Sequence, residues 1–134
     1  MRGFLFRAGV THPERLTAPV HRAYLAPHPS WASRTAMLAF PRQIPSGPAG
    51  PVSELAARLE GGLRRHFSDR PVAIAWGMKD PAFTPRWLEL WLQTFPHADV
   101  LRLADAGHYL QEDAHERVIP ALLHFLGVAA TPAT

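Results

Sequence analysis

The sequence contains no cysteine and, although it holds 14 basic residues, only one lysine, Lys79. The absence of cysteine excludes disulfides, thiolate zinc sites, iron–sulfur clusters and a cysteine nucleophile. It also fits a cytoplasmic location, which is what we expect for this chain. No stretch reaches the roughly 18 apolar residues that a membrane span needs, and the N-terminal apolar stretch is too short for a secretory signal.

The excess of positive over negative charge is also small: there are 14 basic and 11 acidic residues, and the net charge is only +3. Apart from Arg64 and Arg65, the arginines are scattered along the chain. Nucleic-acid binding needs a clustered basic face, so we expect no nucleic-acid partner. The eight histidines show no metal-ligand spacing with carboxylates on one helix face, and we expect no metal site.

Proline, in contrast, is abundant in the first part of the chain. Eight of the 14 prolines precede residue 52, and each one fixes φ and discourages helix at the residue before it. The pattern predicts two short helices, over residues 16–25 and 30–40, followed by a loop over 41–51. We therefore predict that residues 1–52 form a segment that packs on something else.

The pattern becomes regular from residue 53. The predicted elements are a helix from Ser53, a strand over residues 72–76, a helix from Thr84, a strand over residues 99–103, and a last helix with Asp113 and Glu116 as its capping box. Strands that alternate with helices predict an α/β fold with a parallel sheet. Two strands are too few for such a sheet, so we predict that residues 53–128 hold only part of it. We expect residues 129–134 to form a disordered tail.

Each predicted strand is followed by a titratable side chain, Asp80 after the first and His108 after the second. In parallel sheets the active residues stand just beyond the carboxyl ends of the strands, so these two loops should be neighbours. A carboxylate that accepts the Nδ1 proton of a histidine fixes its tautomer and lets the ring act as a general base. Asp105, beside His108, is a competing carboxylate, although we favour a structural role for it.

These loops carry a resemblance to a known family. The segments Trp76-Gly77-Met78-Lys79-Asp80 and Asp105-Ala106-Gly107-His108-Tyr109-Leu110-Gln111-Glu112-Asp113 resemble the acid loop and the histidine loop of α/β-hydrolases. The sequence of these two segments is most similar to that of the haloalkane dehalogenases and their relatives, the epoxide hydrolases and β-lactone decarboxylases. Upstream, three segments are similar to the helical cap of that group: Tyr24-Leu25-Ala26-Pro27, Ser33-Arg34 and Phe40-Pro41-Arg42-Gln43-Ile44-Pro45.

The resemblance implies a covalent mechanism on a small apolar substrate. An aspartate would form an alkyl–enzyme ester, and water activated by His108 and oriented through Asp80 would hydrolyse it. Phe83 and Tyr109 would line the substrate pocket or belong to the core. No cofactor and no metal are implied. The nucleophile elbow of the family, which precedes the acid in chain order, has no counterpart in this sequence, so we expect the N-terminal half of the fold to be absent.

The sequence leaves three hypotheses for this chain. In the first, it is the acid–histidine portion of a dehalogenase-like hydrolase and has little activity alone. In the second, it is a non-catalytic fragment or interaction module, which is completed by a separate N-terminal half or associates with itself through its exposed sheet edge. In the third, it derives from a serine esterase of the same fold.

Overall fold

The structure is a computed structural model that describes residues 8–42, 44 and 51–128. The chain divides into two compact units. The sheet unit joins the residues up to Leu16 with those from Arg70 onward, and the helical unit is Thr17–Asp69. Neither boundary falls at residue 52, where the sequence suggested one. The reason is that residues before Leu16 bond to the sheet unit, as described below. The predicted tail, residues 129–134, lies outside the described residues.

The helical unit holds the short helices that the prolines predicted. Its elements are α2 (Ala18–Leu25), the 3-10 turn η2 (Ala32–Arg34), α3 (Thr35–Arg42) and α4 (Pro51–Phe67). Helix α2 begins after Thr17 with Pro19 in its first turn, where proline is tolerated. Helix α4 begins at Pro51 and not near Ser53, because proline suits the first turn of a helix. Of the predicted loop, residues 43 and 45–50 lie outside the described residues.

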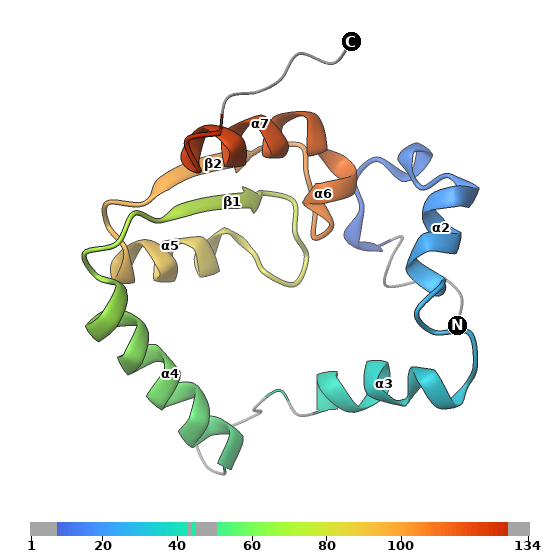
Figure 1. Cartoon of the computed structure of the whole chain (residues 1–134), viewed down its shortest axis with the longest axis horizontal. Coiled ribbons are helices and arrows are strands. Elements are labelled where there is room, and N and C mark those ends of the chain that lie inside the picture. The colour runs from blue at the N-terminus through green and yellow to red at the C-terminus, as the bar shows by residue number, and fades with distance from the viewer. Residues whose placement is uncertain (1–7, 43, 45–50, 129–134) are drawn as a thin grey trace. The chain divides into compact units, whose positions relative to one another are not determined.

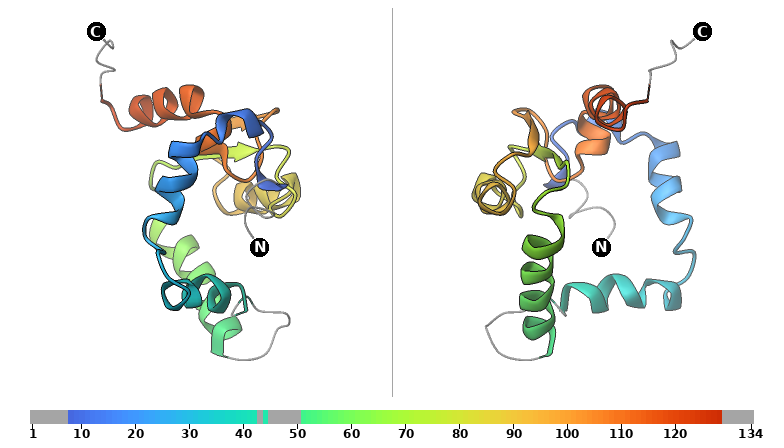
Figure 2. Two further views of the ribbon diagram at one scale, coloured as in Figure 1. Left: turned by 90° about the vertical axis from the view of Figure 1, so that its right-hand side faces the viewer. Right: turned by 60° about the vertical axis from the view of Figure 1, so that its left-hand side comes forward.

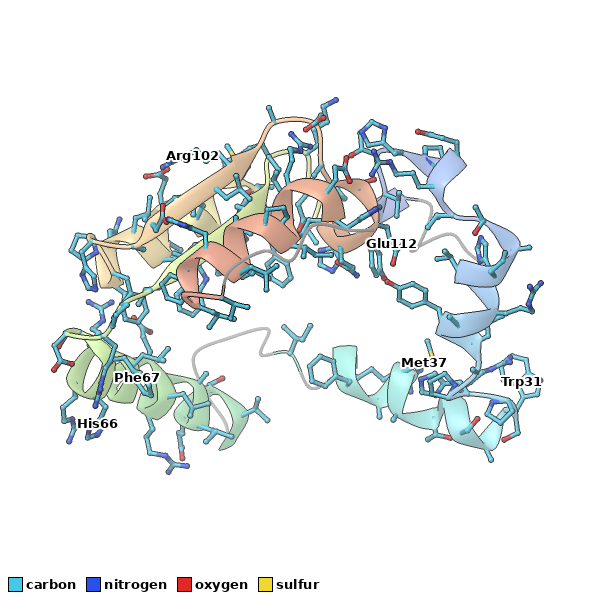
Figure 3. All side chains as sticks on the ribbon, turned by 45° about the horizontal axis from the view of Figure 1, so that its top comes forward. Trp31, Met37, His66, Phe67, Arg102 and Glu112 are labelled. Atoms are coloured by element: carbon cyan, nitrogen blue, oxygen red, sulfur yellow. The ribbon has the colours of Figure 1, made fainter. Side chains whose placement is uncertain are left out.

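Large apolar side chains of the helical unit remain exposed. Trp31 is 81% exposed and Met37 is 55% exposed, and Figure 3 shows both on the segment that contains η2 and α3. Every buried hydrophobic residue of the described chain belongs instead to the sheet unit. No helix within the described ranges is long and apolar enough to cross a bilayer.

The sheet unit is a two-stranded parallel sheet between helices, which confirms the predicted α/β class. Its strands are β1 (Ala73–Gly77) and β2 (Asp99–Leu103), and their register pairs Ala73 with Asp99 and Gly77 with Leu103. Helix α5 (Pro85–Thr94) connects them, and η1 (Pro13–Arg15), α6 (Leu110–Asp113) and α7 (His115–Phe125) complete the unit. Helices α5 and α7 lie on opposite faces of the sheet in Figure 1 and in both views of Figure 2.

The core of the sheet unit is small. Leu103, Ala106, Ala114 and Val118 form one buried cluster, and Leu88 of α5 is fully buried on the other face. The aromatic side chains along α5 are only partly buried. Phe95 is 4% exposed, whereas Trp87 and Trp91 remain 48% and 41% exposed. Two strands offer too little surface to cover two indole rings.

The predicted capping box of the last helix is wrong. The chain breaks at Ala114, with φ −151° and ψ 29°, and α7 starts at His115 without a side-chain cap. Asp113 ends the short helix α6 and is 1% exposed, because its carboxylate accepts hydrogen bonds from elsewhere in the sheet unit. Gly127, with φ +68°, follows the end of α7 in the left-handed conformation that glycine favours.

An ion pair attaches the N-terminal segment to α7. Both terminal nitrogens of Arg15 donate to the carboxylate of Glu116, at 2.8 and 2.9 Å. This hydrogen-bonded arginine lowers the pKa of Glu116 to about 2 from an ordinary 4.5. Residues around 15 and 116 are thus held together although they are far apart in sequence.

We expect Leu88→Ala to lower the free energy of unfolding by about 2–5 kcal/mol, because it leaves a cavity at a fully buried position. Leu90→Ala, on the same helix but 43% exposed, is the matched control and should cost less than about 1 kcal/mol. Urea unfolding measures both. Equal losses in the two variants would show that α5 does not pack as described.

The Arg15–Glu116 pair predicts a pH-dependent contribution to stability. The pKa of Glu116 is about 2 when folded and near 4.5 when unfolded, so the pair stabilises the fold fully above pH 4.5. That contribution is lost as the pH falls toward 2. Urea midpoints of the wild type and Glu116→Gln, compared from pH 6 downward, should converge over that range. A difference that stays constant with pH would contradict the ion pair.

Candidate active site

The two predicted loops leave the sheet at the same edge. Gly77 ends β1 opposite Leu103 at the end of β2. Beyond the strands, Met78 N–H donates to the Leu103 carbonyl and Lys79 N–H donates to the Ala106 carbonyl, both at 2.9 Å. The backbone of the acid loop is therefore bonded directly to the backbone of the histidine loop. Asp80 and His108 are brought together by this pairing.

The site is centred on a hydrogen-bonded carboxylate–imidazole pair. His108 Nδ1 and Asp80 Oδ2 are 2.8 Å apart, and the side chains are 35% and 9% exposed. The other oxygen, Asp80 Oδ1, accepts from the backbone N–H groups of Ala82 and Phe83 at 2.8 and 2.9 Å. One oxygen thus fixes the carboxylate in its turn while the other holds the ring. This arrangement leaves Nε2 of His108 as the nitrogen that can accept a proton.

Two aromatic rings contact the imidazole. The Phe83 ring stacks on His108 with centroids 5.4 Å apart and an interplanar angle of 19°. The Tyr109 ring meets His108 edge-on at 5.2 Å and 81°. Phe83 is held in turn, because Trp76 Nε1 donates to its carbonyl at 3.0 Å, yet it stays 48% exposed. Both residues singled out from the sequence therefore touch the candidate base.

Three glycines allow the surrounding backbone segments to approach one another. A Cβ on Gly77 would collide with the carbonyl oxygens of Gly107 and Ala106, and a Cβ on Gly107 would collide with the Gly9 carbonyl oxygen. A Cβ on Gly9 would lie 2.8 Å from the Tyr109 ring. Only a residue without a side chain fits at these contacts. The acid loop, the histidine loop and the N-terminal segment are thus stacked backbone on backbone.

The N-terminal segment around Gly9 is a part of the site that the sequence did not predict. The Gly9 carbonyl accepts the N–H groups of His108 and Tyr109, at 2.6 and 3.2 Å. The segment lies about a hundred residues before the histidine loop and has no periodicity or motif of its own. Asp113, which bonds to it, carried a signal that was read as a helix cap.

Asp105 does not compete for His108. Its carboxylate pairs with Arg117 of α7, and this hydrogen bond lowers the pKa of Asp105. This contact with Arg117 agrees with the structural role that we expected for Asp105. Among the residues that the structure describes, no group of three or more histidines and carboxylates is arranged to hold a metal ion.

Comparison with known proteins finds relatives over most of the chain. The sequence model of the family described as "alpha/beta hydrolase fold" matches residues 1–115. A cis-3-alkyl-4-alkyloxetan-2-one decarboxylase of Xanthomonas campestris pv. campestris is 39% identical over 112 residues, which are 84% of this chain and 37% of that protein. Haloalkane dehalogenase 2 of Mycobacterium tuberculosis is 35% identical over 124 residues, 92% of this chain and 41% of that protein.

The chain spans 37% and 41% of the lengths of these relatives. A second oxetanone decarboxylase, from Shewanella oneidensis, is 37% identical over 115 residues, which are 86% of this chain and 36% of that protein. The matched names are those of the dehalogenase-like group whose acid and histidine loops this sequence resembles. That resemblance is thereby confirmed.

Replacing glycine by alanine should have opposite effects on the free energy of unfolding at Gly107, where the backbone is crowded, and at Gly61, where it is open. Gly107→Ala should lower the free energy of unfolding by about 1–3 kcal/mol, because the new methyl group meets backbone and not a side chain that can turn away. Gly61→Ala, in α4 with nothing within 4 Å of the new methyl group, should raise it by about 0.5–1 kcal/mol. Urea unfolding of both variants tests this pair. A neutral Gly107→Ala would contradict the close approach.

Proposed function

This chain belongs to the α/β-hydrolase fold family, and from that premise we propose that it carries the acid–base half of a hydrolytic site. His108 is the general base and Asp80 is the carboxylate that orients it. The observation that supports this assignment is the 2.8 Å contact between His108 Nδ1 and Asp80 Oδ2 at the carboxyl ends of two neighbouring parallel strands. Catalytic pairs of this kind occupy that position in open parallel sheets.

In the proposed reaction an aspartate outside these 134 residues attacks a carbon that bears a leaving group. An enzyme ester forms. A halide leaves with the bonding electrons, whereas in an epoxide one C–O bond breaks and the oxygen stays on the substrate and takes a proton from solvent. A water molecule then attacks the ester carbonyl while His108 Nε2 takes one of its protons. Asp80 stabilises the imidazolium that results. As the tetrahedral intermediate collapses, the imidazolium returns its proton to the departing alkoxide, which releases an alcohol and regenerates the aspartate and the neutral histidine.

The aromatic rings around His108 favour an apolar substrate. Phe83 stacks on the imidazole and remains half-exposed, so one face of the base is screened from water while apolar surface is presented beside it. We propose that Phe83 and Tyr109 line the space in which a small apolar substrate meets His108. Neither ring carries a charge that would bind an ionic substrate.

A second candidate reaction is the decarboxylation of a β-lactone. Two of the relatives are named as cis-3-alkyl-4-alkyloxetan-2-one decarboxylases, and their identities of 39% and 37% exceed the 35% of the dehalogenase. An oxetan-2-one is a strained four-membered ester, and its alkyl groups suit an apolar pocket. The two reactions share the acid–base pair and differ in the ring or bond that the nucleophile opens.

The open edge of the sheet supports a function of another class, that of an interaction module. Only two strands pair in the described residues, so β1 has one edge without a neighbouring strand there. Beside it, apolar side chains of Trp76, Trp91 and Phe95 line a hollow on the α5 face. We propose an N-terminal hydrolase half as the partner that covers this edge, with a second copy of the chain as the alternative.

Urea unfolding of the chain separates an independent module from a fragment that needs a partner. A cooperative transition with a slope normal for 134 residues supports an independent module. A broad transition with a shallow slope supports the need for a partner.

The catalytic proposal is tested in a chimaera in which residues 8–128 replace the matched segment of haloalkane dehalogenase 2. Halide release from 1,2-dibromoethane should be lost in His108→Ala and should fall by about 10³–10⁴-fold in Asp80→Asn. In that variant the amide oxygen keeps the N–H groups of Ala82 and Phe83, so the NH₂ group, which is a donor, faces Nδ1. Asp105→Asn makes the same chemical change in the histidine loop and should stay within a few-fold of the parent chimaera.

A chimaera that folds and releases halide equally well with His108→Ala would overturn the assignment of the base. A folded chimaera that is inert toward bromoalkanes but consumes a cis-dialkyl oxetan-2-one would select the second candidate.

A further inference from the structure

A buried carboxylate outside the acid–base pair lies next to the histidine loop. Asp113 is 1% exposed. Its Oδ1 accepts the N–H groups of Thr11 and His12 at 3.0 and 2.9 Å, and its Oδ2 accepts the N–H groups of Gly107 and Thr11 at 2.8 and 3.0 Å. We propose that Asp113 is a positioning residue that locks the entry segment, residues 9–12, onto the histidine loop and thereby fixes His108.

The charge of Asp113 is compensated by backbone dipoles. Among the described residues its hydrogen-bond donors are three backbone N–H groups, those of Thr11, His12 and Gly107, which converge on one carboxylate. Hydrogen bonds from N–H groups to a buried carboxylate are short and strong, and an N–H group left without such a partner costs free energy. Each of the three donors therefore depends on the one side chain.

The carboxylate closes a ring of contacts around the candidate base. Asp113 holds Gly107, the residue before His108, and also holds Thr11, two residues after Gly9. The Gly9 carbonyl in turn accepts the N–H of His108 at 2.6 Å. The main chain of His108 is thus bonded directly to the entry segment and indirectly through Asp113. Because Asp80 reaches His108 only at its ring, the 2.8 Å contact requires that the main chain of His108 stay in place.

Asparagine at position 113 is the informative substitution, because it keeps the shape and replaces one acceptor oxygen by an NH₂ donor. Both carboxylate oxygens accept hydrogen bonds from N–H groups, so either orientation of the amide sets a donor against a donor. Asp105→Asn, the same change at an exposed carboxylate of the same loop, is the matched control.

The experiment uses the ¹⁵N-labelled 134-residue chain under conditions in which circular dichroism shows both variants folded. Asp113→Asn should exchange the amides of Thr11, His12 and Gly107 at least tenfold faster than the wild type, and the low-field signal of the His108 Nδ1–H should disappear. Asp105→Asn should keep both. A purely structural role would lower the unfolding midpoint but leave the ring signal in the folded molecules. Retention of that signal and of amide protection in Asp113→Asn would overturn the proposal.

A second measurement keeps the proposal testable if Asp113→Asn does not fold. In the unmodified chain, the amides of Thr11, His12 and Gly107 should exchange through one common opening, with equal protection within about tenfold. Unprotected Thr11 and His12 beside a protected Gly107 would overturn it.

The inference rests on the proposed function only for the role of His108 as base. Its readouts need no turnover. An inert chimaera with an intact His108 ring signal would therefore count against the proposed function and leave the role of Asp113 standing.

Discussion

The close approach of three backbone segments at Gly77, Gly107 and Gly9 is the constraint on which the candidate site depends. A side chain at any of the three positions would meet backbone or ring atoms at less than contact distance. Because the segments touch, the acid loop can bond to the histidine loop, and the Gly9 carbonyl can accept the His108 N–H. The hydrogen bond between Asp80 and His108 follows from this stacking, since a carboxylate and an imidazole reach 2.8 Å only when their main chains are held at the right separation.

Each carboxylate near the site has a distinct environment that defines what it can do. Asp80 uses one oxygen for two N–H groups of its own turn and the other for the histidine. Asp113 is buried and accepts backbone donors only, whereas Asp105 is exposed and pairs with Arg117. A carboxylate whose oxygens are all occupied by backbone donors cannot orient a histidine directly. It can only fix the loop that carries one, which is the difference between Asp113 and Asp80.

The two units differ in how much of their apolar surface they bury. The sheet unit has a core around Leu103 and Leu88, while the helical unit leaves Trp31 and Phe40 largely exposed. Few buried contacts mean little stabilisation, because burial of apolar surface is the main favourable term in folding. The sheet unit is therefore the part of the chain that can hold a precise site. Within the described residues two strands pair, and the chain spans 36–41% of the lengths of these relatives.

The sequence by itself determined the order of the elements, the parallel pairing of β1 with β2, and the meeting of Asp80 with His108. These depend on local patterns: apolar runs, prolines at helix starts, and the rule that parallel strands end at one edge. Only the tertiary structure decided the roles of Gly9 and Asp113, the break at Ala114 and the exposure of Trp87 and Trp91. Those features depend on contacts between residues about a hundred positions apart, or on how much surface a two-stranded sheet can cover. Neither the long-range contacts nor the surface that the sheet covers can be predicted from the spacing of residues that are close in sequence.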